Sequence, residues 1–453
     1  MGDSEKTSLL PTEPASAAPV EGPLRTRMAL ATGAEKRLAL DLSVVAGNAY
    51  GVAGDLGREH FLFDIRAGGG PVSRVRLPLN LSLALDRSGA MEGEILDYAR
   101  RACAYIVDLL EPNDLISIVI FDGSGAEVVV PARRVANKLQ IKEAISRITV
   151  GSESNLYEGL LAACSQINSV KTIHTLNRVL LLTGAAPTVG VSESSAIFSQ
   201  VAEQKGRGIG ITTLGVGPEY HEELLAGIAR RSGGSYYYIA RPELIPEIFR
   251  LELDTLMRVT ARNLHLRLVL ARGVSVRQVP GQMPVFGQRS AEVTLIDVER
   301  EMGLSSLWEL EMTPRAAGIY RLAVAELFYD DALTGKQEKL TADVIWEFTA
   351  DRRRIGTGMD PRLQGEIEVA HAARALDMML LGLKTQQVDL KTQQVNREQV
   401  MQKLNRTKTL MLDHGKLAQA QQITQAMRDI QGGGAVEKTL VGTIYTLDQG
   451  KTR

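Results

Sequence analysis

The chain of 453 residues is too long for a single hydrophobic core of ordinary size, so we expect two or three domains. Its 52 Lys and Arg residues balance 53 Asp and Glu residues, and 44% of its residues are hydrophobic. This composition is typical of a soluble globular protein. It gives no electrostatic reason to expect a nucleic acid or an anionic membrane surface as a partner.

The N-terminal residues 1–24 are rich in Pro, Ala and Ser and are expected to form a disordered tail. They lack the basic start and apolar core of a signal peptide, and no later segment approaches the roughly 18 apolar residues of a membrane span. These observations predict a cytoplasmic protein. Cys103 and Cys164 fall on the apolar side of predicted helices, so we expect buried free thiols rather than a disulfide or a catalytic group.

Residues 25–76 contain two segments in which apolar and polar residues alternate, as they do in half-buried antiparallel strands. These segments are RLALDLSVVAGN (37–48) and REHFLFDIRAG (58–68). They are expected to form one part of a β-sandwich.

Residues 77–257 alternate strands and helices. The nearly continuous apolar run at 79–85 is typical of a strand buried on both faces of a parallel sheet. Repeated strand and helix units joined by short loops predict an α/β fold with a doubly wound, mainly parallel sheet and helices on both of its faces. Further strands are expected at 114–121, 126–131, 178–183, 208–217 and 235–240, and helices at 92–110, 135–148, 156–168, 194–205, 222–231 and 242–256.

After residue 257 the two-residue period returns, and residues 258–352 contain several segments patterned like the strands of an antiparallel sandwich. The simplest arrangement joins these segments to the strands of residues 25–76. The α/β domain would then be inserted between two parts of one antiparallel β-sandwich.

Residues 361–432 are predicted to form a helical tail that ends at three consecutive glycines, and 433–453 a C-terminal extension. Within the tail, LKTQQVD (383–389) is repeated as LKTQQVN (390–396). The Leu and Val positions of the repeat lie about 140° apart on a helix, so they do not form a coiled-coil seam. We therefore favour an antiparallel helical hairpin over a parallel dimer, with self-association as an open alternative. Deletion from Pro361 onward is expected to leave the α/β domain folded.

Four segments of the α/β part resemble the von Willebrand factor A (VWA) domain of bacterial proteins. The resemblance covers about residues 77–256 and implies a Rossmann-like, doubly wound sheet. The flanking strands and the helical tail resemble the sandwich and C-terminal helices that accompany such domains in bacterial chains similar to the calcium-activated chloride channel regulators. The four segments are PLNLSLALDRSGAMEGEILDYARRAC, SNLYEGLLA, VLLLTGAAPTVG and ITTLGVGPEYHEELLAGIARRSGGSYYYIARPELIPEIF.

In that family the carboxyl edge of the sheet holds a metal-ion-dependent adhesion site. The site is built from an Asp-x-Ser-x-Ser loop, a Thr from a second loop and the Asp of a Thr-Asp-Gly sequence, which together offer Mg²⁺ the oxygen ligands that it prefers. The resemblance places Asp86 and Ser88 at the first two positions and Ser154 at the Thr position. Ala90 and Gly184 stand where a Ser and an Asp would be, so two of the ligands have no side-chain oxygen.

The substituted positions predict a degenerate adhesion site, in which Asp86 and Ser88 hydrogen-bond loop amides and no cofactor is required. The alternative is a weak Mg²⁺ site, or a Ca²⁺ site, that is completed by a carboxylate from a neighbouring loop. The candidates for that additional ligand are Glu92, Asp122 and Glu153.

Other kinds of functional site have little support in the sequence. The six histidines are widely separated, and no HExxH motif or Cys/His cluster indicates zinc. GIGITTLGVG (208–217) lacks the lysine of a phosphate-binding loop, and DGSGA (122–126) precedes a predicted hairpin, where a nucleophile elbow would require a helix. Aromatic residues are only 5% of the chain, so a surface for stacking bases is not expected. These observations argue against an enzyme.

The residues and the resemblance together favour a non-enzymatic scaffold or adaptor that binds protein partners. Two alternatives stay open. One is a metal-dependent receptor with a residual adhesion site, and the other is a structural subunit that self-assembles into an oligomer or filament. The resemblance also implies an ATPase of the MoxR type as a partner, by analogy with the family.

Overall fold

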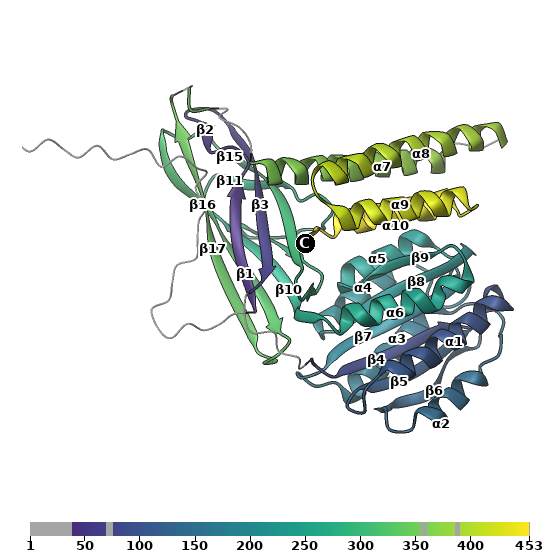
Figure 1. The fold of residues 1–453 in the computed structure, drawn as a ribbon. Coiled ribbons are helices and arrows are strands. Elements are labelled where there is room, and N and C mark those ends of the chain that lie inside the picture. The colour runs from purple at the N-terminus through teal and green to yellow at the C-terminus, as the bar shows by residue number, and fades with distance from the viewer. Residues whose placement is uncertain (1–38, 69–75, 352, 356–359, 386–389, 453) are drawn as a thin grey trace, which may run out of the picture.

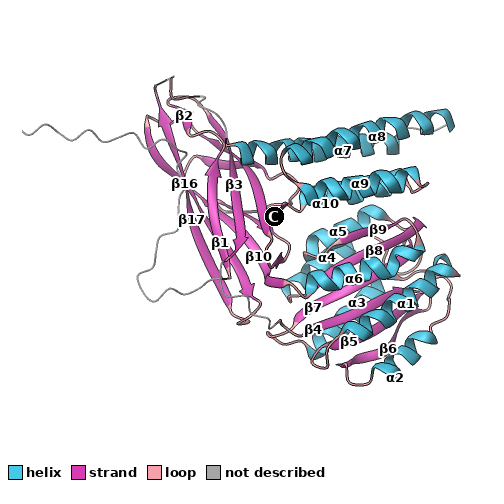
Figure 2. Cartoon of the chain, in the orientation of Figure 1, coloured by secondary structure: helices cyan, strands magenta, loops and turns pink. Residues whose placement is uncertain are grey.

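A computed structural model describes residues 39–68, 76–351, 353–355, 360–385 and 390–452 of the chain (Figure 1). These residues form two antiparallel sheets, one mainly parallel sheet with helices on both faces, and a group of C-terminal helices (Figure 2). The tail predicted at residues 1–24 lies outside the described part of the chain.

The two antiparallel sheets share one hydrophobic core, which includes Phe63, Trp308 and Val344. Strands from before and after the α/β part pair with each other, because β3 runs antiparallel to β15 from Gly57 opposite Met312 onward. This pairing confirms that the α/β part is inserted in one antiparallel sandwich. The first sheet has the order β1-β3-β15-β11 with β18 beside β15, and the second has the order β12-β13-β10-β16-β17-β2 with β14 beside β10. The strands of both sheets pair antiparallel except β2, which runs parallel to β17. The strands are β1 (Leu40–Ala46), β2 (Tyr50–Val52), β3 (Gly57–Ala67), β10 (Val259–Leu270), β11 (Val274–Gln278), β12 (Val285–Gly287), β13 (Ser290–Thr294), β14 (Val298–Glu299), β15 (Gly303–Met312), β16 (Gly318–Asp331), β17 (Gln337–Thr349) and β18 (Lys451–Thr452).

The third sheet has the order β6-β5-β4-β7-β8-β9, and its neighbouring strands are parallel except for the antiparallel pair of β5 and β6. All residues of the central strand β4 are buried, as the apolar run at 79–85 predicts. One face of the sheet packs against α1, α2 and α6, and the other packs against α3, α4 and α5. The doubly wound α/β fold is therefore confirmed. The strands are β4 (Leu79–Asp86), β5 (Leu115–Asp122), β6 (Gly125–Arg134), β7 (Leu176–Ala185), β8 (Gly210–Glu219) and β9 (Tyr236–Ile239), and the helices are α1 (Glu94–Leu109), α2 (Lys138–Ser146), α3 (Leu156–Val170), α4 (Ser194–Gly206), α5 (Glu222–Ser232) and α6 (Ile245–Leu256).

In the described part of the chain, four helices follow the second group of sandwich strands. They are α7 (Pro361–Thr385), α8 (Leu390–Asp413), α9 (Leu417–Gln431) and α10 (Val436–Asp448). Each helix contacts the next, and α10 returns to contact α7. The helical tail predicted as a hairpin is thus part of a four-helix group, which also includes α10 from the segment predicted as a C-terminal extension. Residues 386–389, at the junction of the two heptad copies, lie outside the described residues.

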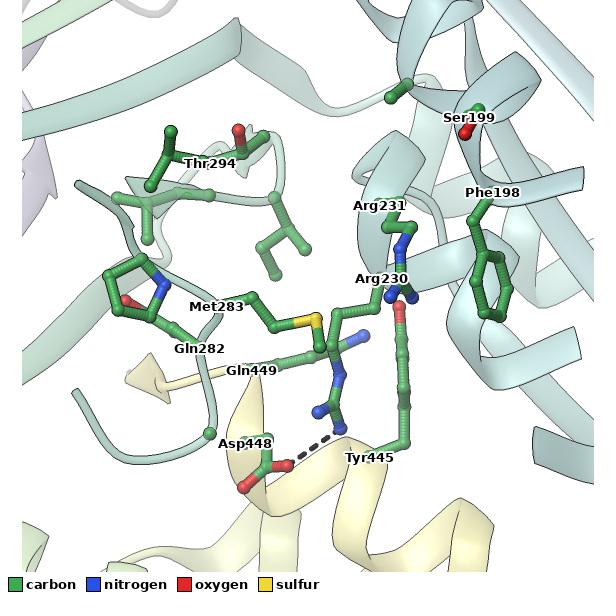
Figure 3. Close-up of a pocket in the computed structure, with 16 residues that line it drawn as sticks. Phe198, Ser199, Arg230, Arg231, Gln282, Met283, Thr294, Tyr445, Asp448 and Gln449 are labelled. Atoms are coloured by element: carbon green, nitrogen blue, oxygen red, sulfur yellow. Dashed lines mark hydrogen bonds and ion pairs between the residues drawn. The ribbon is translucent and has the colours of Figure 1, made fainter. Parts of the chain in front are cut away.

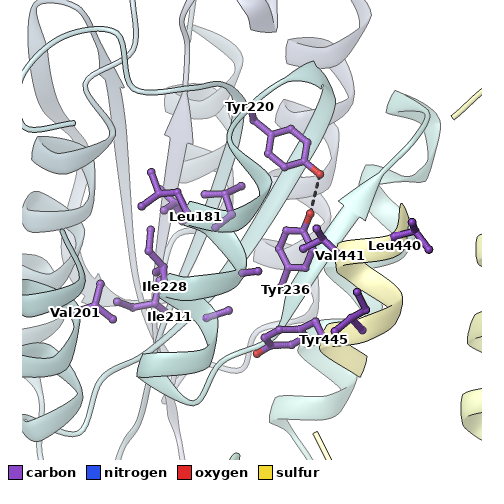
Figure 4. Close-up of a cluster of buried hydrophobic side chains, with 14 of the residues drawn as sticks. Leu181, Val201, Ile211, Tyr220, Ile228, Tyr236, Leu440, Val441 and Tyr445 are labelled. Atoms are coloured by element: carbon purple, nitrogen blue, oxygen red, sulfur yellow. Dashed lines mark hydrogen bonds between the residues drawn. The ribbon is translucent and has the colours of Figure 1, made fainter. Parts of the chain in front are cut away.

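Helix α10 packs on the edge strand β9 of the parallel sheet and on α5 (Figure 4). The Tyr445 ring meets the Tyr236 ring edge to face with centroids 5.9 Å apart, and the Tyr445 hydroxyl donates to the Gly234 carbonyl at 2.6 Å. The C-terminal helices and one face of the sheet belong to a single apolar core. Deletion of these helices is therefore expected to destabilise the α/β part, contrary to the expectation from the sequence.

Charged and polar side chains are buried between the parallel sheet and the sandwich. Arg178 of β7 pairs with Asp297 at 2.7 Å, and its side chain is only 4% exposed. Lys205 of α4 lies 3.5 Å from the Asn263 side-chain oxygen, and burial lowers the pKa of its ammonium group. Asn263 in turn donates to Asp330 at 2.6 Å. Both of these buried cations of the α/β part, Arg178 and Lys205, thus have a polar partner from the sandwich.

Candidate functional site

Three loops meet at the carboxyl edge of the parallel sheet, where they follow β4, precede α3 and follow β7. Backbone hydrogen bonds connect them. Gly89 N donates to the Ser152 carbonyl at 2.6 Å, and Thr188 N donates to the Ser154 carbonyl at 3.0 Å. The loops therefore form one connected unit, which fixes the positions of the side chains predicted for the adhesion site.

Asp86 is the last residue of β4 and is fully buried within this unit. Its Oδ1 accepts a hydrogen bond from Ser88 N at 2.8 Å, and its Oδ2 accepts from the Thr183 hydroxyl at 2.6 Å and from the Ser154 hydroxyl at 3.3 Å. Burial raises the pKa of the Asp86 carboxyl, although the hydrogen bonds from Thr183 and Ser88 act in the opposite direction. The structure thus brings together Asp86, Ser88 and Ser154 and adds Thr183 to them.

The other two adhesion-site positions contribute no side-chain oxygen. The side chain of Ala90 is a methyl group. A Cβ atom added at Gly184 would lie 3.0 Å from the Met91 sulfur and 3.2 Å from the Ala90 carbonyl oxygen. A carboxylate at position 184 would therefore require the buried Met91 side chain to shift. The Ser88 hydroxyl makes no hydrogen bond of ordinary geometry with any described residue, although it lies near enough to Asp86 to favour the charged carboxylate.

The three carboxylates considered as additional ligands have different surroundings. Glu92 and Glu153 are exposed, whereas Asp122 is buried and pairs with Arg87 at 2.9 Å. Burial acts to raise the pKa of Asp122, but hydrogen bonds from Ser124 and Arg87 outweigh burial and lower that pKa. Within the described ranges, no three His, Cys, Asp or Glu side chains form a group that could hold a metal ion.

Sequence reasoning did not anticipate two of the contacts at this edge. Thr183 was visible as a polar side chain at a strand end, but its bond to Asp86 depends on the pairing of β4 with β7. The Thr188 hydroxyl accepts a hydrogen bond from Ser154 N at 2.9 Å. Thr188 lies in a loop of Ala, Pro and Gly residues, and that composition contains no signal for its role.

Residues 80–251 match the family model of the von Willebrand factor type A domain. The parallel sheet and its loop edge are therefore a VWA domain. The chain is 29% identical over 276 residues to the uncharacterized protein sll0103 of Synechocystis sp., a match that covers 59% of this chain and 65% of that protein. It is 26% identical over 274 residues to the uncharacterized protein YfbK of Escherichia coli K12, covering 59% of this chain and 47% of that protein. The matched region thus spans about half to two thirds of these curated relatives.

Among solved structures, the fold is similar to that of a von Willebrand factor type A protein from Catenulispora acidiphila, with a TM-score of 0.66 and 18% identity. That match covers 86% of this chain and 90% of the other, and at this identity it shows the fold alone. The matched residues 80–251 thus form a VWA domain, which is an interaction and adhesion domain. Among the described helices, none has the length and apolar character needed to cross a membrane.

Proposed function

We propose that this chain is a non-enzymatic scaffold or adaptor whose VWA domain binds a protein partner without a metal ion. The observation that supports this proposal most directly is the hydrogen bonding of the Asp86 carboxylate. Its two oxygens already accept hydrogen bonds from three groups of the chain itself. In this proposal Asp86 holds the loops of the binding edge in place and does not serve as a ligand to a metal.

The chemistry of the donor set supports the same proposal. Mg²⁺ requires near-octahedral oxygen ligands and gives up its bound water reluctantly. Of the five adhesion-site positions only Asp86 supplies a carboxylate, while Gly184 supplies no charge and Ala90 no side-chain oxygen. A receptor that depends on Mg²⁺ or Ca²⁺ is the alternative, and it would require a carboxylate from a neighbouring loop to move toward Asp86.

The partner would contact the exposed parts of the loops around Asp86. Four exposed glutamates follow β4, precede α3 or end β8, and they are Glu92, Glu94, Glu153 and Glu219. Their charge would fit a partner surface that presents Lys and Arg residues. The family adhesion site instead uses its metal to attract an acidic partner, so a metal-free edge of this composition would select the opposite charge. The MoxR-type ATPase implied by the family resemblance stays a prediction.

A double substitution, Ala90→Ser with Gly184→Asp, is expected to create Mg²⁺ binding that the unaltered chain lacks. It restores one hydroxyl and one carboxylate. The Cβ atom at position 184 requires the flexible Met91 side chain and the Ala90 carbonyl to give way by a few tenths of an ångström. A ligand that binds only the folded state raises the melting temperature, and the rise grows with the ratio of ligand concentration to its Kd. Thermal melting with increasing Mg²⁺, followed by calorimetric titration, measures this effect.

The matched control is Ala90→Ser with Gly184→Asn, which adds a side chain of the same size without the charge. We expect the Asp variant to respond to Mg²⁺ and the Asn variant to show no response. If neither variant responds, the loops do not have the adhesion-site arrangement and the assignment of Gly184 to the lost ligand position is wrong. If both respond equally, the missing carboxylate is not what prevents Mg²⁺ binding.

A further inference from the structure

A cavity of about 480 Å³ lies where three parts of the molecule meet (Figure 3). The VWA domain contributes α4 and α5, the sandwich contributes residues 281–285 and 294–296, and the C-terminal helices contribute α10. Helix α5 leads back from the carboxyl edge of the sheet to the start of β9, so the arginines in its last turn lie at the edge opposite to Asp86. The cavity is thus distinct from the proposed binding edge.

Two adjacent arginines line this cavity, and they differ in their partners. Arg230 pairs with Asp448 of α10 at 2.8 Å. The Arg231 guanidinium lies over the Phe198 ring at 3.8 Å from its centroid and donates one hydrogen bond, to the Gly227 carbonyl at 3.3 Å. Among the described residues, no carboxylate pairs with Arg231. Of the described charged residues that line the cavity, Arg230 and Asp448 compensate each other, and Arg231 leaves one positive charge without a paired carboxylate.

The rest of the lining is largely apolar. Met283 and Val285 come from the sandwich side, with 56% and 73% of their surface exposed, and Leu295 and Ile296 also line the cavity. Figure 3 shows Met283 extending toward the two arginines from the opposite side of the cavity. Partial burial and the neighbouring charge of Arg230 lower the pKa of Arg231, so an anion placed beside Arg231 would relieve an unfavourable environment.

We propose that this cavity binds a small amphipathic monocarboxylate, with its carboxylate on Arg231 and its apolar body against the Met283 and Val285 side. The single uncompensated charge fits a monoanion, and the planar guanidinium can hold a carboxylate through two parallel hydrogen bonds. The volume falls within the range of about 300–1,000 Å³ that is usual for small-molecule sites. Because the cavity is lined by three parts of the molecule, the bound carboxylate stabilises their mutual arrangement.

Calorimetric titration of the full chain with octanoate tests this proposal, with octanamide as the uncharged ligand of the same length. The unaltered chain binds octanoate with measurable affinity and octanamide at least about tenfold more weakly, because octanamide lacks the charge-assisted hydrogen bonds. Arg231→Gln weakens octanoate binding by a similar factor. Ala202→Trp, an exposed position on α4 at the rim of the cavity, abolishes binding of both ligands by blocking entry.

Arg250→Gln is the matched control, since Arg250 is exposed on α6, pairs among the described residues only with Asp254 of the same helix, and does not line the cavity. It leaves octanoate binding unchanged, and thermal melting of each variant verifies that it is folded. The proposal is overturned if the unaltered chain does not bind octanoate at millimolar concentration. It is equally overturned if octanamide binds as well as octanoate, or if Arg231→Gln binds octanoate as well as the unaltered chain does. None of these results depends on Asp86 or on the proposed metal-free edge.

Discussion

Replacement of Tyr445 by Ala is expected to lower the free energy of unfolding by about 3–5 kcal/mol, as is usual when a large buried aromatic side chain is removed. Tyr445 of α10 is 3% exposed and packs edge to face on Tyr236 of the VWA sheet. The substitution would leave a cavity in the apolar core that α10 shares with the sheet and would remove the hydrogen bond to the Gly234 carbonyl. Urea denaturation followed by circular dichroism measures the change.

Two further variants separate packing from other effects. Tyr445→Phe keeps the ring and loses only the hydrogen bond, so we expect a cost of about 1 kcal/mol. Leu417→Ala removes a side chain that is 57% exposed at the start of α9, and it should be nearly neutral. If Tyr445→Ala is as stable as Leu417→Ala, α10 does not stabilise the VWA sheet, and the inference that the two share one apolar core is wrong.

The second large effect is expected at the buried ion pair between the VWA domain and the sandwich. Asp297→Asn should cost about 3–5 kcal/mol, because it leaves the Arg178 guanidinium buried without the compensating negative charge. It would also remove a carboxylate whose charge helps to keep Lys205 protonated against the effect of burial. The same denaturation experiment measures the loss.

Asp254→Asn is the matched control, since it breaks an exposed pair within one helix, Arg250 with Asp254 at 3.0 Å. Exposed pairs contribute about 0–1 kcal/mol, so this variant should be almost as stable as the unaltered chain. Equal stabilities of Asp297→Asn and Asp254→Asn would contradict the burial of the Arg178 pair and its role in joining the two parts.

Much of the fold could be predicted because its signals are local. The apolar run at 79–85 indicates a strand covered on both faces, and β4 is such a strand. Helix α10 was missed because its β-branched residues lower its helix propensity when they are considered alone. In the structure its threonines return hydrogen bonds to the preceding turn, from Thr439 to Ala435 O and from Thr443 to Thr439 O, both at 2.9 Å. Contact with the VWA sheet, which the sequence pattern does not contain, supplies the rest of its stability.

The candidate site was predictable in its residues and less so in its contacts. The spacing of Asp86 and Ser88 and the family resemblance indicated which side chains belong to the edge. The occupation of the Asp86 oxygens depends on how three loops meet, which no local pattern specifies. The cavity at the opposite edge could not be predicted either, because residues as far apart in the sequence as Arg231 and Tyr445 line it.

The measurement that tests the central claim most directly is thermal melting of the metal-free chain with increasing Mg²⁺, Mn²⁺ and Ca²⁺, beside the Asp86→Ala variant. If Asp86 holds the loops in place and does not bind a metal ion, millimolar cation leaves the melting temperature of the unaltered chain unchanged. Asp86→Ala then melts at a lower temperature even without metal, because the Thr183 and Ser154 hydroxyls and Ser88 N lose their acceptor. A rise in the melting temperature of the unaltered chain that grows with cation concentration and disappears in Asp86→Ala would contradict the account and show a working metal site.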